Sequence, residues 1–242
     1  MERAQIMIDN SSDLNEILKY SLKMSAQKMR TLAVFDLDST LFNVSTRTQK
    51  ILEQFAHEYE LDDLKTIEIL HSDWGIKEAL LRKGYKDEEH KELHTNLRDF
   101  WFQRFFSNEY LHYDVPYAGA IEFVLELAAT GAEIKYLTGR DVERMGRGSK
   151  EILLKWGFPC TDEQLILKPH RSQDDELFKR DWFIQLDREH YHKIYFFENE
   201  PVNINAVLEH CPDVEIIFLD TTHARKQTVT AKIQRIPHFK RS

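Results

Sequence analysis

Five short apolar runs, rich in isoleucine, valine, phenylalanine and tyrosine, predict buried β-strands. They cover residues 32–35, 132–137, 164–167, 193–197 and 214–219. Their apolar character is nearly continuous, whereas a strand with one solvated face would alternate apolar and polar residues. Continuous runs are typical of parallel strands that are covered on both faces.

Helical patterns separate the last four runs. One apolar stripe lies within residues 121–128 and precedes Gly131, and another lies within 152–156 and precedes Gly157. Glycine commonly follows the last turn of a helix, so both helices are predicted to end there. Because strands and helices alternate, the predicted fold class is α/β, a Rossmann-like parallel sheet flanked by helices. In open sheets of this kind the ligand binds at the carboxyl ends of the strands.

The gap between the first two strands is too long for one crossover helix. Residues 44–115 look helical throughout, which predicts an inserted all-helical cap subdomain, with residues 1–43 and 116–242 forming the α/β core. The aromatic segment 100–106 fits the packing core of a small helical bundle better than a pocket lining. Residues 1–30 form a predicted helical extension whose apolar face carries Leu14, Ile17, Leu18 and Leu22. We expect this face to pack on the core; a dimer contact is the alternative.

Two carboxylates follow the first predicted strand. Asp36 and Asp38 are two positions apart, so both side chains can point to one small volume, with Thr40 two positions further on. Paired acids repel each other unless a cation or a shared proton offsets their charge. Such a pair suits phosphoryl transfer, in which one carboxylate attacks phosphorus and the other handles the proton of the leaving group. A solvated strand end with nothing bound is the alternative.

Composition narrows the class of protein. The 242 residues are 42% hydrophobic and carry a net charge of −8, which argues against a nonspecific nucleic-acid or membrane-surface role. Cys160 and Cys211 lack the CxxC spacing of a metal or redox motif and suggest a reduced, cytoplasmic protein. The first residues lack the apolar stretch of a secretory signal, and no segment approaches the length of a membrane span.

Three segments together resemble the haloacid dehalogenase superfamily, specifically phosphatase-like members with a helical cap inserted after the first motif. They are residues 34–40 (VFDLDST), 134–140 (IKYLTGR) and 194–201 (IYFFENEP), and the resemblance covers residues 32–220. It implies that Asp36 is the nucleophile and Asp38 the general acid/base. It also implies Mg²⁺ held by Asp36, Asp38 (through its main-chain carbonyl) and Glu198.

The phosphate-binding residues are predicted less directly. Thr138 offers a hydroxyl at a strand end, and the Gly139 N–H lies beside it, which suits a phosphate oxygen. The resemblance also implies a phosphate-binding lysine on a helix near the 194–201 segment. Lys179 fits this placement best, with Lys168 second. Arg140 is expected either to touch substrate or to form a salt bridge at a helix start.

The sequence departs from the family pattern at two places. Ser39 stands where glycine is commonest, and Glu198-Asn199 replaces the usual acidic pair. Glu198 still offers a carboxylate, although its extra methylene shifts the ion or the backbone. Glu200 is a further carboxylate in reach. A surface acidic turn without metal is the alternative reading.

Together these features predict a cytoplasmic, Mg²⁺-dependent phosphomonoesterase that hydrolyses a small phosphorylated metabolite through an aspartyl phosphate. One alternative is a binding or regulatory protein that kept the fold and lost catalysis, suggested by the altered third segment. Another is a nucleic-acid end phosphatase, against which the acidic cap argues, with ten basic and fifteen acidic residues in 44–115. The sequence leaves the substrate and the oligomeric state open.

Overall fold

A six-stranded parallel sheet forms the centre of the molecule in the computed structural model, which describes residues 11–241. Its strand order is β5-β4-β1-β6-β7-β8. The strands are β1 (Thr31–Phe35), β4 (Glu133–Asp141), β5 (Leu165–Lys168), β6 (Lys193–Glu198), β7 (Glu215–Leu219) and β8 (Gln234–Ile236). All five predicted strands are present and the α/β fold class is confirmed. The short β8 was not predicted, because three residues give too brief an apolar pattern.

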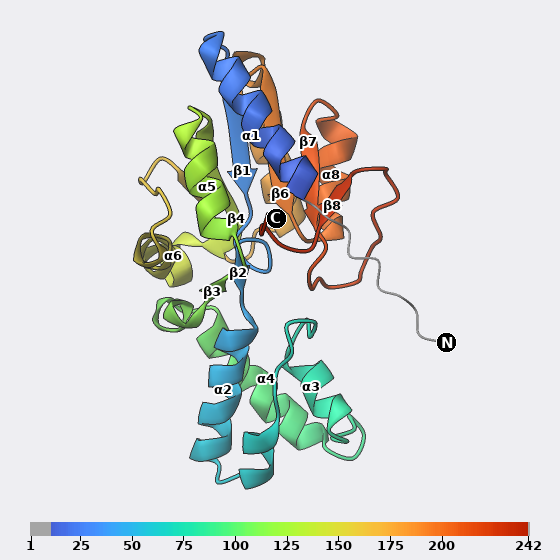
Figure 1. Cartoon of the computed structure of the whole chain (residues 1–242). Helices are drawn as coiled ribbons and strands as arrows, with labels where there is room; N and C mark the ends of the chain where they lie inside the picture. The colour runs from blue at the N-terminus through green and yellow to red at the C-terminus, as the bar shows by residue number, and fades with distance from the viewer. Residues whose placement is uncertain (1–10, 242) are drawn as a thin grey trace, which may run out of the picture.

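Helices cover both faces of this sheet (Figure 1). They are α1 (Ser11–Ala26), α5 (Ala120–Ala129), α6 (Val142–Trp156), α7 (Asp175–Gln185), the 3₁₀ helix η3 (Arg188–His190) and α8 (Pro201–His210). Successive strand residues point to opposite faces. Phe35 therefore joins the hydrophobic cluster that includes Phe123 of α5, while Val34 joins the cluster that includes Phe183 of α7. Covering on both faces explains why the strands read as continuous apolar runs.

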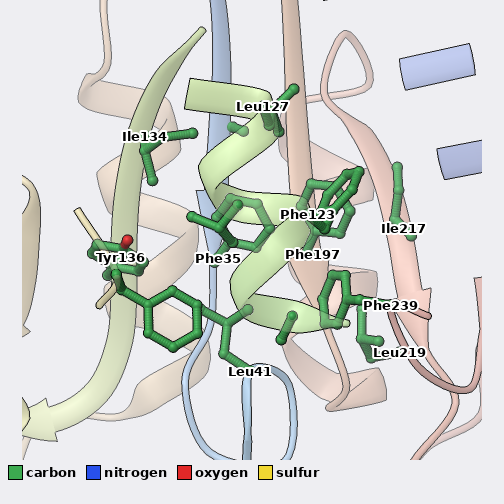
Figure 2. Packing of buried hydrophobic residues seen from close by; sticks show 14 of the residues in the cluster. Phe35, Leu41, Phe123, Leu127, Ile134, Tyr136, Phe197, Ile217, Leu219 and Phe239 are labelled. Atoms are coloured by element: carbon green, nitrogen blue, oxygen red, sulfur yellow. The ribbon is translucent and has the colours of Figure 1, made fainter. Parts of the chain in front are cut away.

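Aromatic rings fill the layer between the sheet and α5 (Figure 2). Phe35 and Phe197, on neighbouring strands, stack with ring centroids 4.4 Å apart. Phe123 meets Phe35 and Phe197 edge-on, at 6.4 and 5.6 Å, and the C-terminal segment adds Phe239. Offset and edge-on pairs of this kind stabilise a core beyond their buried area. This packing fixes the ends of β1 and β6, where the predicted nucleophile Asp36 and the predicted metal ligand Glu198 lie.

Helix α1 packs against the same layer. Leu14 and Ile17 are buried there, so the prediction that the N-terminal segment packs on the core is confirmed for its described part. Leu22 is 59% exposed, and its predicted place on the buried face is wrong. The buried stripe instead continues through Ser21 and Met24, because helical spacing of three to four residues leads from Ile17 to these positions. Residues 1–10 of the predicted extension lie outside the described part.

The chain between β1 and β4 forms a separate helical unit. A short antiparallel pair, β2 (Phe42–Asn43) and β3 (Val115–Pro116), carries the chain out and back. Between them lie α2 (Ser45–Glu58), η1 (Asp62–Thr66), α3 (Ile76–Arg82), α4 (Lys91–Phe105) and η2 (Asn108–Tyr113). These helices bury their own hydrophobic cluster and lie beyond one end of the sheet (Figure 1). We call residues 44–115 the cap; its division from the core as a domain stays a prediction.

The aromatic segment 100–106 has two environments. Phe100 and Phe105 are buried in the cap cluster, as expected for packing residues, whereas Phe102 is 50% exposed. Within the described residues, no helix has the length and apolar character needed to cross a membrane.

Candidate active site

Asp36 and Lys179 meet where β1 ends. Asp36 is the first residue after β1, and its neighbour in register on β6 is Glu198, because Phe35 pairs with Phe197. Lys179, buried on α7, donates hydrogen bonds of 2.6 Å to both Asp36 Oδ1 and Glu198 Oε2. Lys168, the second candidate, instead pairs with Asp175 and the carbonyl of Gln173. The structure therefore brings Lys179, and not Lys168, to Asp36.

Glu198 is fully buried and surrounded by donors. Its Oε1 accepts the main-chain N–H groups of Asn199 and Glu200, both at 2.9 Å. Its Oε2 accepts Lys179 and the amide nitrogen of Asn203, the latter at 3.2 Å. A carboxylate has about four lone-pair sites, and these four donors occupy them. In this arrangement Glu198 fixes the ammonium group of Lys179 beside Asp36.

The charge balance of this trio sets the protonation of Asp36. Burial raises the pKa of Asp36 to about 7; Lys179 offsets part of this effect, and Glu198 adds to it. Burial by itself would lower the pKa of Lys179, but Asp36 and Glu198 outweigh it and raise that pKa above its usual value. Two acids and one cation leave one net negative charge in an apolar setting. Such a site favours binding of a further cation or proton.

Asp38 belongs to a second network, together with Arg47, Arg140 and Asp114. Arg47 Nη2 and Arg140 Nη2 each donate to Asp38 Oδ1 at 2.6 Å. Both arginines also bind Asp114, through Arg47 Nε at 2.8 Å and Arg140 Nη2 at 2.7 Å. Arg47, Arg140 and Asp114 are almost completely buried, whereas the Asp38 side chain keeps 31% exposure. Within this network the Asp38 side chain is therefore partly exposed to solvent, whereas the other three side chains are buried.

This network joins the core to both ends of the cap. Arg47 lies in the first turn of α2, just after β2, and Asp114 directly precedes β3. Arg140 comes from the end of β4 and pairs with Asp38 and Asp114, not with a group at a helix start. Burial would raise the pKa of Asp38, but Arg140 and Arg47 outweigh it and hold that pKa well below its usual value. Asp38 is ionised in this arrangement.

Thr138 and Gly139 lie in the C-terminal half of β4, at the end of the sheet where Asp36 also lies. Thr138 is 1% exposed and its Oγ1 accepts the Arg140 N–H at 3.3 Å. A Cβ added to Gly139 would come within 2.4 Å of the Asp175 carboxylate, so only glycine fits without a shift. Both residues line the cavity that Asp36 and Lys179 also line. The predicted phosphate-binding groups therefore face one space.

The turn after Asp38 is strained. Ser39 has φ of 61°, in the left-handed region where a side chain costs about 1–2 kcal/mol. This explains why glycine is the commoner residue at this position of the motif. The Ser39 carbonyl accepts the Thr221 hydroxyl at 2.5 Å, and Thr40 Oγ1 donates to Asn199 Oδ1 at 3.0 Å. These bonds hold the turn against the segments that follow β7 and β6, respectively.

The cavity that Asp36 lines also carries oxygen atoms of the kind that a hard divalent cation takes. Within residues 11–241, no three His, Cys, Asp or Glu side chains are grouped to hold a metal. The Asp38 carboxylate faces arginines, and Glu198 is occupied by its four donors. Asn199 Oδ1, which accepts one hydrogen bond, and the buried, unpartnered Oε1 of Glu200 lie in the same loop. Carboxylate, amide and carbonyl oxygens are the ligands that Mg²⁺ takes.

The cavity between core and cap has a volume of about 1230 Å³. The core contributes Asp36, Thr138 and Lys179, and the cap contributes side chains from α3, the loop before it and one face of α4. The carboxyl ends of the strands lie at its floor, as expected for an open α/β sheet. Asp38, Arg140 and Glu198 line the same space, whereas Arg47 and Asp114 do not.

Comparison with known proteins identifies the fold. No protein-family model matches the sequence, and no curated protein matches it. Protein tyrosine kinase A of Mycobacterium tuberculosis aligns with a TM-score of 0.52 and 15% identity, over 86% of this chain and 94% of that one. A HAD-superfamily hydrolase from Ehrlichia chaffeensis aligns with 0.49 and 13%, over 87% and 93%. A putative phosphatase from Clostridium difficile aligns with 0.49 and 13%, over 86% and 94%. The alignment with tyrosine kinase A shows that the two chains share an overall α/β fold.

Four residues of the site were not predicted as such. Arg47, Asp114 and Asn203 carry no local motif, and their partners lie at least five positions away in sequence. From the sequence, Asn199 was distinguished only because Glu198-Asn199 replaces the acidic pair that is usual in the family it resembles. Its place directly after a strand end, next to Glu198, was the available signal.

Proposed function

We propose that this protein is a magnesium-dependent phosphomonoesterase that hydrolyses a small phosphorylated metabolite through an aspartyl-phosphate intermediate. The observation that carries the proposal is the 2.6 Å pair of Lys179 and Asp36 at the floor of a cavity. A nucleophilic carboxylate beside a fixed cation, below a space large enough for an organic phosphate, suits attack on phosphorus.

Asp36 attacks phosphorus through a carboxylate oxygen while the bond from phosphorus to the leaving oxygen breaks. Lys179, the Thr138 hydroxyl and the Gly139 N–H offset the negative charge on the phosphoryl oxygens. Water then attacks phosphorus, phosphate leaves and the Asp36 carboxylate is restored. Glu198 acts through Lys179, because its other bonds keep the ammonium group in place.

Asp38 serves as the general acid/base. Paired with Arg47 and Arg140 it is ionised, which suits the second step, when it takes a proton from the attacking water. For the first step it must carry a proton to the leaving oxygen, and this requires separation from at least one guanidinium. Arg47 belongs to the cap, so movement of the cap changes this contact.

The metal completes the charge balance. When bound, Mg²⁺ would draw the negatively charged phosphate toward the negatively charged nucleophile. Asp36 and the main-chain carbonyl of Asp38 would hold it, with a third oxygen from the loop after β6. The predicted third ligand is Glu198, and Asn199 Oδ1 is the alternative that the hydrogen bonding of Glu198 favours.

The remaining proposals concern the setting of the reaction. The substrate is a small phosphorylated molecule, selected by a cap that closes over the site and excludes bulk water. The two free thiols, Cys160 and Cys211, support a cytoplasmic location.

An assay with p-nitrophenyl phosphate and a panel of phosphorylated metabolites, with and without Mg²⁺, tests the proposal. The wild-type protein should turn over, and rapid acid quenching should trap a phosphoenzyme. Asp36→Asn should abolish both signals while circular dichroism stays unchanged. Turnover by Asp36→Asn at the wild-type rate would exclude Asp36 as nucleophile. A folded wild-type protein with neither turnover nor Mg²⁺ binding would favour the non-catalytic role.

A further inference from the structure

The cap side of the cavity differs in character from the rest of the cap. Trp74, in the loop before α3, and Phe102 of α4 both line the cavity, and their side chains are 56% and 50% exposed. About half of the surface of these large aromatic residues is exposed at the cavity wall and is not covered by other side chains of the protein. They are suited to holding a flat ring of a ligand.

One face of α4 runs along this wall. Lys91, Arg98, Phe102 and Phe105 all line the cavity, and their spacing places them on one side of the helix. Phe105 marks the end near the catalytic acids, because its ring lies 4.0 Å from the guanidinium of Arg47, which binds Asp38. Along this face of α4, the aromatic residues lie nearer to the catalytic acids, and the basic residues Arg98 and Lys91 lie farther from them.

The aromatic part of this wall is fixed against the core. The Arg144 guanidinium of α6 lies 5.2 Å from the ring of Phe106 and 6.0 Å from that of Phe102. Trp101 stacks on Phe105 with ring centroids 4.3 Å apart. These contacts hold the rings on the cavity side of the cap in place. A preformed aromatic surface binds a flat ring with little loss of entropy.

The charge of the wall is also distinctive. The cap as a whole has five more acidic than basic residues, but its cavity-lining charged residues are three basic and two acidic: Lys77, Lys91, Arg98, Glu78 and Asp87. Along an α-helix, Arg98 lies about 6 Å and Lys91 about 16 Å from Phe102. The Arg98 guanidinium pairs with the exposed Asp99, through Nη2 at 2.9 Å. A second negative group on the ligand, one turn beyond the flat ring, would meet the same guanidinium.

The size of the cavity agrees with a ligand of several parts. Its volume of about 1230 Å³ exceeds the roughly 300–1,000 Å³ of typical small-molecule sites. A sugar phosphate alone would leave most of the wall of α4 uncovered.

We propose that the cap wall formed by Trp74, Phe102 and Arg98 binds the base and a second phosphate of a nucleoside phosphate, whose reacting phosphate lies at Asp36. This inference rests on the proposed function, since it names the substrate class of the same site. Base–aromatic stacking tightens binding by about 5- to 150-fold per base, enough to select nucleotides over sugar phosphates. The bound nucleoside phosphate is either a free nucleotide or the phosphorylated end of an oligonucleotide.

Equilibrium binding to the Asp36→Asn protein, measured by calorimetry with Mg²⁺ present, tests this proposal. The probes are ribose phosphate, adenosine monophosphate, adenosine bisphosphate and a phosphorylated dinucleotide. Adenosine monophosphate should bind at least about 10-fold more tightly than ribose phosphate. Adding Phe102→Ala or Trp74→Ala should weaken adenosine monophosphate about 5- to 50-fold and leave ribose phosphate unchanged. Arg98→Ala should reduce the preference for the bisphosphate about 5-fold.

Matched controls lie on the cap but outside the cavity. Tyr59 is a 51% exposed aromatic and Lys83 an exposed cation, and neither lines the cavity. Tyr59→Ala and Lys83→Ala should leave all four affinities unchanged. Equal affinity for ribose phosphate and adenosine monophosphate, or equal losses in Tyr59→Ala and Phe102→Ala, would overturn the proposal.

The two proposals fail in different experiments. Turnover of p-nitrophenyl phosphate by the wild-type protein reports the phosphatase activity and does not need the cap wall. If that turnover is present and the four probes show no base preference, only the nucleotide proposal fails. Tighter binding of the dinucleotide than of the bisphosphate identifies an oligonucleotide end as the source, and weaker binding identifies a free nucleotide.

Discussion

Arg47 on the first helix of the cap donates a 2.6 Å hydrogen bond to Asp38 in the core. The same guanidinium binds Asp114 at the other end of the cap and the carbonyl of Phe105. A single buried side chain thus connects the candidate acid/base to both segments through which the cap joins the core.

Arg47→Met should destabilise the protein by about 3–5 kcal/mol, because it leaves buried Asp114 with one charged partner fewer. Urea denaturation measures this change. Arg104→Met provides the control, since Arg104 pairs with Glu58 at 3.8 Å near the surface and should cost less than about 1 kcal/mol. Similar losses in both variants would show that the buried network contributes little.

Lys179→Gln should lower kcat by about 10³-fold or more, because it removes the cation fixed beside Asp36. Lys168→Gln should change kcat less than about 10-fold, since Lys168 binds Asp175 and a main-chain carbonyl. Steady-state assays of the two folded variants compare these values. The reverse order of effects would assign the phosphate-binding role to Lys168.

Asp36→Asn should stabilise the protein, and more so at pH 8 than at pH 5. Burial raises the pKa of Asp36 to about 7 in the folded protein, against 3.8 for an ordinary aspartate. Between these values the unfolded chain is ionised while the folded site holds its proton. Stability from this group is therefore full below about pH 3.8 and is lost as the pH rises toward 7.

Chemical denaturation of the wild-type and Asp36→Asn proteins at both pH values, with EDTA present, measures the difference. The gain at pH 8 should exceed that at pH 5 by about 1–3 kcal/mol. A gain that is independent of pH would contradict the raised pKa.

Asn199→Asp should tighten Mg²⁺ binding about 10-fold or more, because a carboxylate replaces an amide in the cavity that Asp36 also lines. Glu198→Gln should leave Mg²⁺ affinity within about 10-fold and mainly reduce kcat, since Glu198 holds Lys179. Calorimetric titration with Mg²⁺ alone gives the affinities. A loss of binding confined to Glu198→Gln would make Glu198 the ligand.

Ser39→Gly should raise the free energy of unfolding by about 0.5–1 kcal/mol. The left-handed φ of 61° costs a side chain more than the extra freedom that glycine gives the unfolded chain. Thermal and urea denaturation test this expectation. Destabilisation by Ser39→Gly would mean that the serine hydroxyl makes a stronger contribution than the strain removes.

The sequence by itself determined the sheet, because each parallel strand is buried on both faces and each helix has one apolar face. It also identified Asp36, Asp38 and Thr138 as cavity-lining strand-end residues, since ligand chemistry in α/β proteins gathers at those ends. The sequence did not predict the short strand β8 or the exposure of Leu22, because three residues and a single helix position give too weak a pattern.

Only the tertiary structure decided which charges meet. Arg47, Asp114 and Arg140 come from segments 67 and 26 positions apart and form one network with Asp38. Glu198 holds Lys179 because a helix and a strand pack side by side. Electrostatic energy depends on distance and burial, and neither follows from local sequence. The pattern of apolar residues therefore specified the fold, while the packing of that fold specified the chemistry of the site.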